Sequence, residues 1–153
     1  MTHTFNSPIG AVRLVEEGGS IIRIEFTDIA DTSVTPTPLL HEVEHQITTF
    51  LRGERRQLDF PIRMVGTPFQ QRVWRALQQI PYGTTRTYGE IASAIGNPRA
   101  SRAVGMACNK NPLLLIVPCH RVVGSNGKLV GFAYGTEAKR WLLELESLSY
   151  YKG

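Results

Sequence analysis

The sequence predicts a two-part chain: an α/β domain with a linker over residues 1–65, followed by a mostly helical domain over residues 66–153. Three observations support this prediction. Residues 1–60 read as short strands and one amphipathic helix, and they carry five Lys or Arg against nine Asp or Glu. Residues 61–136 read mostly as short helices, and they carry nine Lys or Arg against one acid, Glu90. Both the apolar pattern and the charge change near Gly66, which is the expected boundary.

The first part alternates between turns and regular elements. Side chains from Ile22 to Phe26 alternate between apolar and charged, as in a half-buried strand. Apolar residues recur at three- and four-residue spacing between Leu39 and Leu51, which predicts a helix that Gly53 ends. The expected order is turn, strand, hairpin loop, strand, linker, helix and extended segment, at residues 7–10, 11–15, 16–20, 21–26, 35–38, 39–52 and 59–65.

The second part contains a helix-turn-helix candidate. A first helix is expected over 68–79. Thr87 and Glu90 then have the spacing of a capping box and open a helix of about eight residues that Gly96 ends. Asn97 and Pro98 provide an N-cap and a first-turn proline for a helix from Pro98 to Asn109. Two short helices joined by a glycine-containing turn are typical of this motif. The last helix begins at Thr136.

The basic block from 61 to 136 indicates a face that binds a polyanion. Arg99 and Arg102 are three residues apart on the expected second helix, and the small side chains of Ala103 and Gly105 let its backbone approach a surface closely. This helix has few side chains that read base edges, which favours nonspecific or minor-groove binding. The alternatives are a solvated basic surface and a small-residue helix packed on its neighbour. Membrane binding is disfavoured because the basic residues do not lie on one strongly amphipathic helix, and no apolar run approaches the roughly 20 residues needed to span a bilayer.

A thiol in an unusual setting is the strongest chemical signal. Pro118 interrupts strand pairing, so Cys119 is expected on a bend, partly exposed, with His120 and Arg121 as nearby cations. These conditions lower a thiol pKa from about 8.5 and favour the nucleophilic thiolate. A water would link Cys119 to His120, and Glu144 or Glu146 would orient the imidazole. The alternatives are a small core side chain for the cysteine and a buried imidazole for the histidine.

Two cysteines, Cys108 and Cys119, provide neither a disulfide framework nor a Cys-x-x-Cys metal spacing. The first residues have no basic patch and no apolar segment, so no secretory signal is expected there. A reducing cytoplasmic setting fits this pattern.

The sequence resembles the O6-alkylguanine-DNA alkyltransferase family. The resemblance covers residues 66–147 and is carried by Pro118–Val123, Gly96–Gly105, Asn111–Pro112 and the Lys139 to Glu146 pattern. It implies a ribonuclease-H-like α/β domain followed by a winged helix-turn-helix domain. It also implies irreversible, single-turnover transfer of the alkyl group of O6-alkylguanine, and of O4-alkylthymine, to Cys119.

The resemblance further implies roles for individual residues. His120 takes the proton of Cys119 through a water, Glu146 orients His120, Asn111 braces the turn below the active-site loop, and Tyr88 helps rotate the nucleotide and protonates the leaving guanine. Arg102 fills the gap in the base stack. The remaining DNA contacts and the base pocket are assigned to Arg99, Ala103, Gly105 and Arg121, and to Val122, Gly131, Phe132, Ala133 and Tyr134.

Two residues depart from the family pattern and predict a bulkier loop over the alkyl group: Tyr134 where glycine is usual, and Phe132 where tyrosine is common. The expected partner is double-stranded DNA with an alkylated guanine. We expect a cytoplasmic, nucleoid-associated monomer without cofactor, metal, membrane or obligate protein partner. The competing hypotheses are a DNA-binding module with a structural cysteine and a thiol hydrolase for small substrates.

Overall fold

The computed structural model describes residues 1–28, 30, 35–129, 132 and 134–152, with 148–152 described by their backbone only. The chain divides into two compact units. The first consists of Met1–Val65 with Pro112–Leu114, and the second of Gly66–Asn111 with Leu115–Gly153. The segment Pro112–Leu114 was expected in the second part, but it pairs with the first unit: the Ile24 amide donates to the Pro112 carbonyl (2.8 Å) and the Leu114 amide to the Ile24 carbonyl (3.2 Å).

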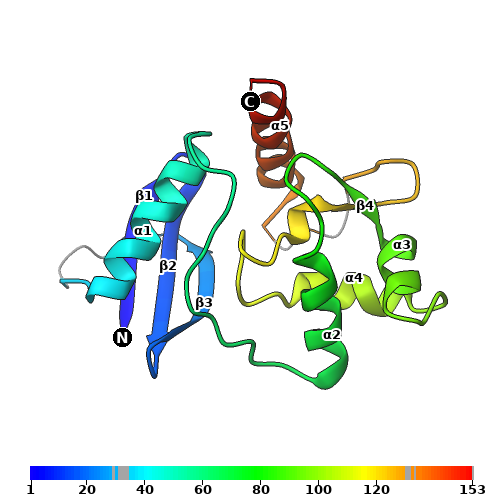
Figure 1. The fold of residues 1–153 in the computed structure, drawn as a ribbon, viewed down its shortest axis with the longest axis horizontal. Helices are drawn as coiled ribbons and strands as arrows, with labels where there is room; N and C mark the ends of the chain where they lie inside the picture. Colours follow the sequence, from blue (N-terminus) through cyan, green and yellow to red (C-terminus); the bar gives the residue numbers. More distant parts are fainter. Residues whose placement is uncertain (29, 31–34, 130–131, 133, 153) are drawn as a thin grey trace. The chain divides into compact units, whose positions relative to one another are not determined.

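The first unit is built on a three-stranded antiparallel sheet in the order β1(Thr2–Ser7), β2(Gly10–Glu17) and β3(Ser20–Thr27) (Figure 1). Strand β1 was not among the expected elements, because Phe5 is its one strongly apolar side chain and no alternation marks it. Its partner defines it instead: β1 pairs with β2 along its whole length, from Thr2 opposite Val15 to Ser7 opposite Gly10.

Helix α1(Pro38–Leu51) packs its apolar side against this sheet (Figure 1). The Thr37 hydroxyl caps it by accepting a hydrogen bond from the Leu40 amide (3.1 Å). Gly53 follows the helix with φ 76°, a conformation that favours glycine and ends the helix. The core of the unit consists of buried strand and helix side chains: Val12, Leu14, Ile21, Ile24, Leu40, Val43, Ile47 and Phe50.

In the second unit, helices α2(Pro68–Leu77), α3(Tyr88–Ala94) and α4(Ser101–Asn109) pack on one another (Figure 1). Two helix starts carry complete capping boxes, with Thr67 and Gln70 at α2 and Thr87 and Glu90 at α3. The indole Nε1 of the buried Trp74 donates to the Ala107 carbonyl (2.9 Å), which ties α2 to α4. The three helices are therefore held together by packing and by a buried hydrogen bond between α2 and α4.

The start of α4 differs from the expectation. The predicted helix began at Pro98, but Asn97 to Ala100 form a turn in which the Ala100 amide donates to the Asn97 carbonyl (3.0 Å). The helix begins at Ser101, and its N-cap, Ala100, provides no side-chain hydrogen bond. Arg99 consequently lies on the turn before the helix and does not share a helical face with Arg102.

The segment that carries the predicted site connects short elements. The 3₁₀ turn η1(Cys119–Arg121) leads directly into β5(Val122–Val123), which pairs in parallel with β4(Arg86–Thr87). Helix α5(Thr136–Lys152) packs against η1. The polypeptide around residue 119 is thus held between a short two-stranded sheet and the last helix.

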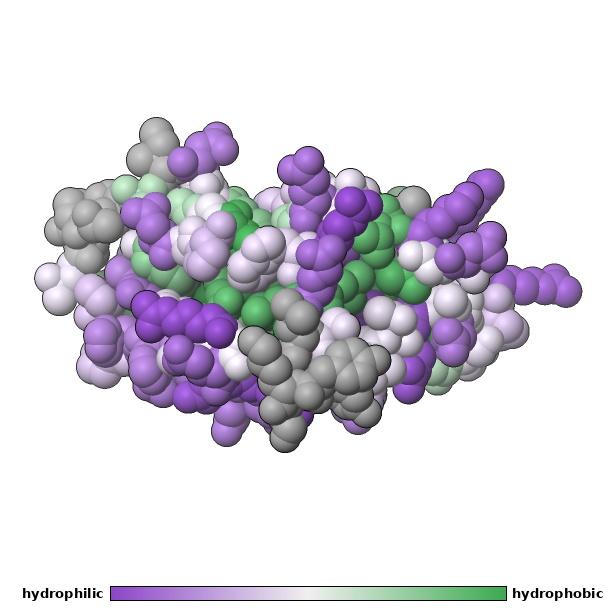
Figure 2. Space-filling model, turned by 90° about the horizontal axis from the view of Figure 1, so that it is seen from above, coloured by the Kyte–Doolittle hydropathy of each residue, from purple (hydrophilic) through white to green (hydrophobic). Residues whose placement is uncertain are grey.

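Polar side chains cover most of the visible face, and hydrophobic atoms show as patches between them (Figure 2). Among the described residues, the large hydrophobic side chains that are exposed are Met1, Val65, Met106 and Tyr134. No helix within this described part combines the length and apolar character that a membrane crossing requires.

Candidate active site

Cys119 opens the turn η1 directly after Pro118. Its amide donates to the Val117 carbonyl (2.8 Å), and the Arg121 amide donates to the Pro118 carbonyl (2.9 Å), so the turn is closed by its own backbone. The bend was expected, but the partial exposure was not: Cys119 is 5% exposed. Burial raises the pKa of the thiol, against a hydrogen bond from Asn111 and the charge of Lys139, which lower it. The resting sulfur is therefore a protonated thiol, which corrects the expected thiolate.

Asn111 braces the loop that carries the thiol. It follows α4, and its amide donates to the Cys108 carbonyl (3.2 Å). Its side-chain Nδ2 donates to the Val117 carbonyl (2.8 Å), and its side chain also hydrogen-bonds the Cys119 sulfur. One buried amide thus links the end of α4 to the backbone before the cysteine and to the cysteine itself.

His120 and Glu146 form a buried pair between η1 and α5. The His120 Nε2 lies 2.7 Å from Glu146 Oε2, and both side chains are 1% exposed. Burial lowers the pKa of His120, and the hydrogen bond and charge of Glu146 oppose that shift. The structure places Glu146 at the imidazole, whereas Glu144 is exposed. A neutral imidazole held by a carboxylate is suited to accept a proton.

Arg121 does not face DNA, and that expectation is wrong. Its side chain is 9% exposed, its Nε donates to Glu146 Oε1 (2.8 Å) and its Nη2 to Glu146 Oε2 (2.9 Å). Burial raises the pKa of Glu146, but the hydrogen bonds and charges of His120 and Arg121 outweigh it and bring the pKa to about 2. The guanidinium is committed to an internal ion pair and is not available to a phosphate.

Tyr88, the first residue of α3, lies near both thiols. Burial raises its pKa to about 12, and ionised forms of Cys108 and Cys119 would act in the same direction. The phenol therefore keeps its proton at neutral pH and can act as a hydrogen-bond donor. Burial also raises the pKa of Cys108 to about 12, so this second thiol is protonated as well.

Lys139 is a residue for which the sequence analysis gave no role. It is fully buried on α5, with its Nζ 5.7 Å from the centroid of the Tyr88 ring. Burial lowers its pKa, whereas ionised forms of Cys119 and Cys108 would raise it. The signal was present in the sequence, because Lys139, Leu142 and Glu146 follow helical spacing, and all three are buried on one side of α5.

A cavity of about 700 Å³ lies beside Tyr88, between the start of α3 and α4. Arg102, Gly105 and Met106 line it together with Ser125 from the loop after β5. Arg102 and Met106 are exposed and one helical turn apart. Ala103 is exposed and lines a smaller cavity of about 180 Å³ on α4 with Met106 and Lys110. Arg102, Gly105 and Tyr88 thus meet at one cavity, while Ala103 lies at the next one and Arg99 on the preceding turn.

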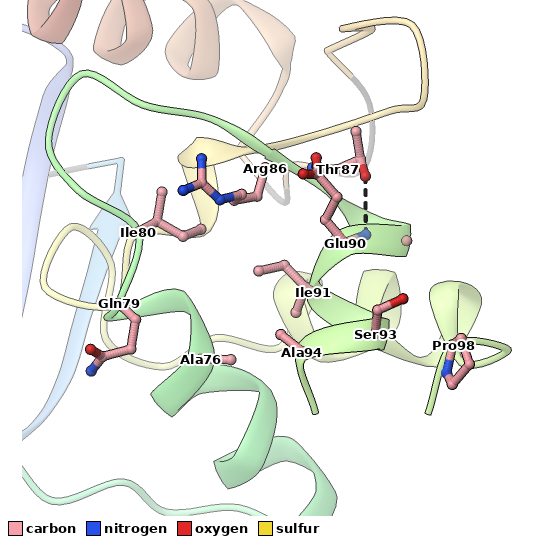
Figure 3. A pocket seen from close by; sticks show the side chains of 11 residues that line it. Ala76, Gln79, Ile80, Arg86, Thr87, Glu90, Ile91, Ser93, Ala94 and Pro98 are labelled. Carbon is pink, nitrogen blue, oxygen red and sulfur yellow. Dashed lines mark hydrogen bonds between the residues drawn. The ribbon is translucent and has the colours of Figure 1, made fainter. Parts of the chain in front are cut away.

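Another cavity, of about 790 Å³, is lined by residues at the end of α2 and by residues of α3 (Figure 3). Thr87 and Gly89 line both this cavity and the one that contains Tyr88. The hydrogen bond from the Glu90 amide to the Thr87 hydroxyl (3.1 Å) rigidifies this turn (Figure 3). The position of Tyr88 is therefore fixed by a capped helix start.

The residues expected to form the base pocket are described in part. Val122 is fully buried in β5. The rings of Phe132 and Tyr134 meet edge to face with centroids 6.0 Å apart, and Tyr134 is 36% exposed. Gly131 and Ala133 lie outside the described residues. Within the described part of the chain, no three His, Cys, Asp or Glu side chains cluster in a way that could hold a metal ion.

Comparisons with known proteins identify relatives of both parts of the chain. The family model described as 6-O-methylguanine DNA methyltransferase, DNA binding domain, matches residues 68–148, and the model for the ribonuclease-like domain of the same protein matches residues 1–64. Proteins named methylated-DNA–protein-cysteine methyltransferase are similar to it. The one from Methanosarcina acetivorans is 46% identical (93% of this chain, 95% of the relative), and the constitutive one from Bacillus subtilis is 42% identical (96% and 95%).

A solved structure has the same fold. The crystal structure of Mycobacterium tuberculosis OGT in complex with DNA aligns with a TM-score of 0.87 and 44% identity, and the alignment covers 97% of this chain and 93% of that one. The two-part architecture expected from the sequence, an α/β domain followed by a helical DNA-binding domain, is confirmed by the family models and by this structure.

Proposed function

Because the chain belongs to the 6-O-methylguanine DNA methyltransferase family, we propose that it repairs DNA by direct reversal, moving the alkyl group of O6-alkylguanine to the sulfur of Cys119. The observation that carries this proposal is the arrangement around the buried thiol. A neutral histidine held by an ionised carboxylate follows the cysteine in the same turn. This arrangement provides a nucleophile with a proton acceptor.

The reaction is a displacement at carbon. The thiol proton passes to His120 through a water, and the thiolate of Cys119 attacks the alkyl carbon. A carbon–sulfur bond forms while the bond between that carbon and guanine O6 breaks, and the electron pair leaves with the base. The hydroxyl of Tyr88 gives its proton to the departing guanine, and Tyr88 and His120 then return to their resting forms by exchange with solvent, so that overall the proton lost by Cys119 ends on the base. The thioether that remains is a poor leaving group, so each molecule reacts once.

DNA reaches this thiol through base flipping. A stacked guanine cannot approach a buried sulfur, and extruding it costs a few kcal/mol, less when the base is damaged and poorly paired. Arg102 is exposed at the rim of the cavity beside Tyr88, where a cation can fill the vacated position in the base stack. The exposed Ala103 and the half-buried Gly105 keep the surface of α4 low enough for close approach to the minor groove.

The proposal also covers the pocket for the flipped base and the form of DNA that the protein binds. Val122, Phe132 and Tyr134 border the base. Phe132 and Tyr134 narrow the room for large alkyl groups. The protein acts on double-stranded DNA as a monomer in the cytoplasm, and phosphate contacts make its affinity fall steeply with salt.

Intact-mass analysis tests the proposal. After incubation with an equal amount of duplex carrying O6-methylguanine, Cys119 should gain one methyl group in exchange for one proton, and no second turnover should follow. Cys119→Ser should bind the duplex and gain nothing, and Cys108→Ser should react like the unaltered protein. An unmodified Cys119 after long incubation would reject the proposal in favour of a DNA-binding module. Repeated turnover would point to a thiol hydrolase instead.

A further inference from the structure

All three nitrogens of the Arg121 guanidinium donate hydrogen bonds to other groups of the protein. Besides the two hydrogen bonds to Glu146, its Nη1 donates to the Ile80 carbonyl (2.9 Å), and its central carbon lies 5.5 Å from the centroid of the Tyr82 ring. The carboxylate that it binds is 1% exposed. An arginine fixed at three points next to a buried histidine–carboxylate pair is placed to control that pair.

We infer that Arg121 is a positioning residue for proton transfer, which fixes the charge and orientation of Glu146 and thereby the tautomer of His120. This inference rests on the proposed function, in which His120 accepts the thiol proton of Cys119.

The hydrogen bonds at one oxygen determine the tautomer. Glu146 Oε2 lies 2.9 Å from Arg121 Nη2 and 2.7 Å from His120 Nε2. An ionised carboxylate has acceptors only, so His120 Nε2 must carry its hydrogen. A neutral imidazole has one N–H, which leaves the lone pair on Nδ1. Nδ1 is therefore the atom that receives the proton from the thiol.

Arg121 also sets the charge that His120 experiences. Among the described residues, the charged groups that act on His120 are Glu146 and Lys139 of α5 and Arg121 of η1. Burial lowers the pKa of His120, Glu146 raises it, and the two cations lower it. Without Arg121, the carboxylate would favour an imidazolium, which has no lone pair to accept a proton. Pairing Glu146 with Arg121 keeps the imidazole neutral and therefore able to accept the thiol proton.

Orientation and charge can be separated experimentally. A guanidinium binds both carboxylate oxygens through a planar fork, whereas a lysine ammonium is a point charge without that geometry. Arg121→Lys therefore retains the charge and loses the fork, while Arg121→Met loses both. Arg75→Met is the matched control, because Arg75 is exposed on α2 and its Nη2 donates to Gln71 Oε1 (3.2 Å) on the same helix.

The first measurement needs no change at Arg121. The ¹⁵N shifts of the imidazole of His120 in the full-length protein report which nitrogen carries hydrogen, with assignment by His120→Gln. We expect a protonated Nε2 and a bare Nδ1 at neutral pH. The opposite tautomer, or an imidazolium at neutral pH, would overturn the inference even if every Arg121 variant failed to fold.

The second measurement follows titration and rate together. Alkyl transfer from the free O6-alkylguanine base is recorded against pH, so DNA binding does not contribute. In Arg121→Met the titration midpoint of His120 should rise by about one pH unit or more, and the acid limb of the rate profile should move up with it. In Arg121→Lys the midpoint should move less, while the rate falls about tenfold or more at every pH, because the carboxylate is no longer held at both oxygens.

The outcomes separate the two proposals. Folded variants that lose thermal stability but keep the midpoint and acid limb of the unaltered protein would show that Arg121 is purely structural, and the inference would fail. An unaltered protein that transfers no alkyl group would remove the proposed function, while the tautomer would still be decided by its own spectrum. A shift in Arg75→Met equal to that in Arg121→Met would also contradict a specific role.

Discussion

Gly105→Ala should stabilise the protein and at the same time weaken its binding to DNA. Gly105 lies inside α4, on the wall of the cavity that Arg102 and Met106 also line. Within the protein, the added methyl group has room: it would lie 3.8 Å and 3.9 Å from two carbons of the Tyr88 ring, which is ordinary contact. The protein itself therefore does not require a glycine at this position.

The two effects have opposite signs and can be estimated separately. Replacing glycine by alanine inside a helix stabilises it by about 1 kcal/mol. For a chain of this size, that raises the melting temperature by about 2–4 °C. If the DNA surface packs against α4, the extra methyl group overpacks the contact at a cost of about 1–3 kcal/mol. Affinity for duplex DNA should then fall by roughly fivefold to a hundredfold.

Thermal unfolding, duplex affinity at one fixed salt concentration and alkyl transfer from the free base test this together. Transfer from the free base should be close to that of the unaltered protein. Ser93→Ala is the control, because Ser93 is an exposed residue of α3 that lines the cavity of Figure 3 and not the one beside Tyr88. A lower melting temperature would refute the packing argument, and unchanged duplex affinity would refute a DNA-facing Gly105.

Three further predictions concern stability and pH. Gly66→Ala should lower the free energy of unfolding by about 1–3 kcal/mol in a urea titration, because its Cβ would lie 2.5 Å from the ring of the buried Trp74. Asn111→Ala should cost about 1 kcal/mol through the lost bond to the Val117 carbonyl. The same variant should slow alkyl transfer at neutral pH and less so at high pH, because the thiol pKa rises without the amide. Folding lowers the pKa of Glu146 from 4.5 to about 2, so the ionised carboxylate adds about 3 kcal/mol to the free energy of unfolding above pH 4.5. This contribution is lost as the pH falls toward 2. In Glu146→Gln, the free energy of unfolding should not show that decrease between pH 4.5 and 2.

The sequence predicted well those elements whose formation depends on residues within the same short segment. Helix α1 was expected over 39–52 and runs over Pro38–Leu51. The agreement is close because both the apolar face and the glycine that ends the helix, Gly53, can be recognised from residues within one short segment. Strand β1 lacks such a pattern and depends on pairing with β2. At the start of α4, Asn97 and Pro98 carry helix-start signals, but the same residue types also favour a turn, and the turn is what forms.

The position of the site in the sequence could be predicted, but the directions in which its side chains point could not. Pro118 marked the bend correctly, and the apolar run before it marked a buried approach. The turn that follows is a 3₁₀ turn with about three residues per turn, so the side chains of Cys119, His120 and Arg121 leave it in three different directions. Which direction faces solvent depends on where α5 packs, and that contact joins residues 25 positions apart. Adjacent basic residues therefore could not show that Arg121 turns inward.

The burial of Cys119 changes how its reactivity is understood. An exposed thiolate next to two cations would react with oxidants and stray electrophiles. A protein that can use its thiol once would then lose it before meeting a lesion. Burial raises the pKa of the sulfur and keeps it protonated at rest. The proposed reaction consequently requires a base that is already neutral and correctly oriented when the alkylated guanine arrives, and this requirement is the reason for the roles that we propose for His120, Glu146 and Arg121.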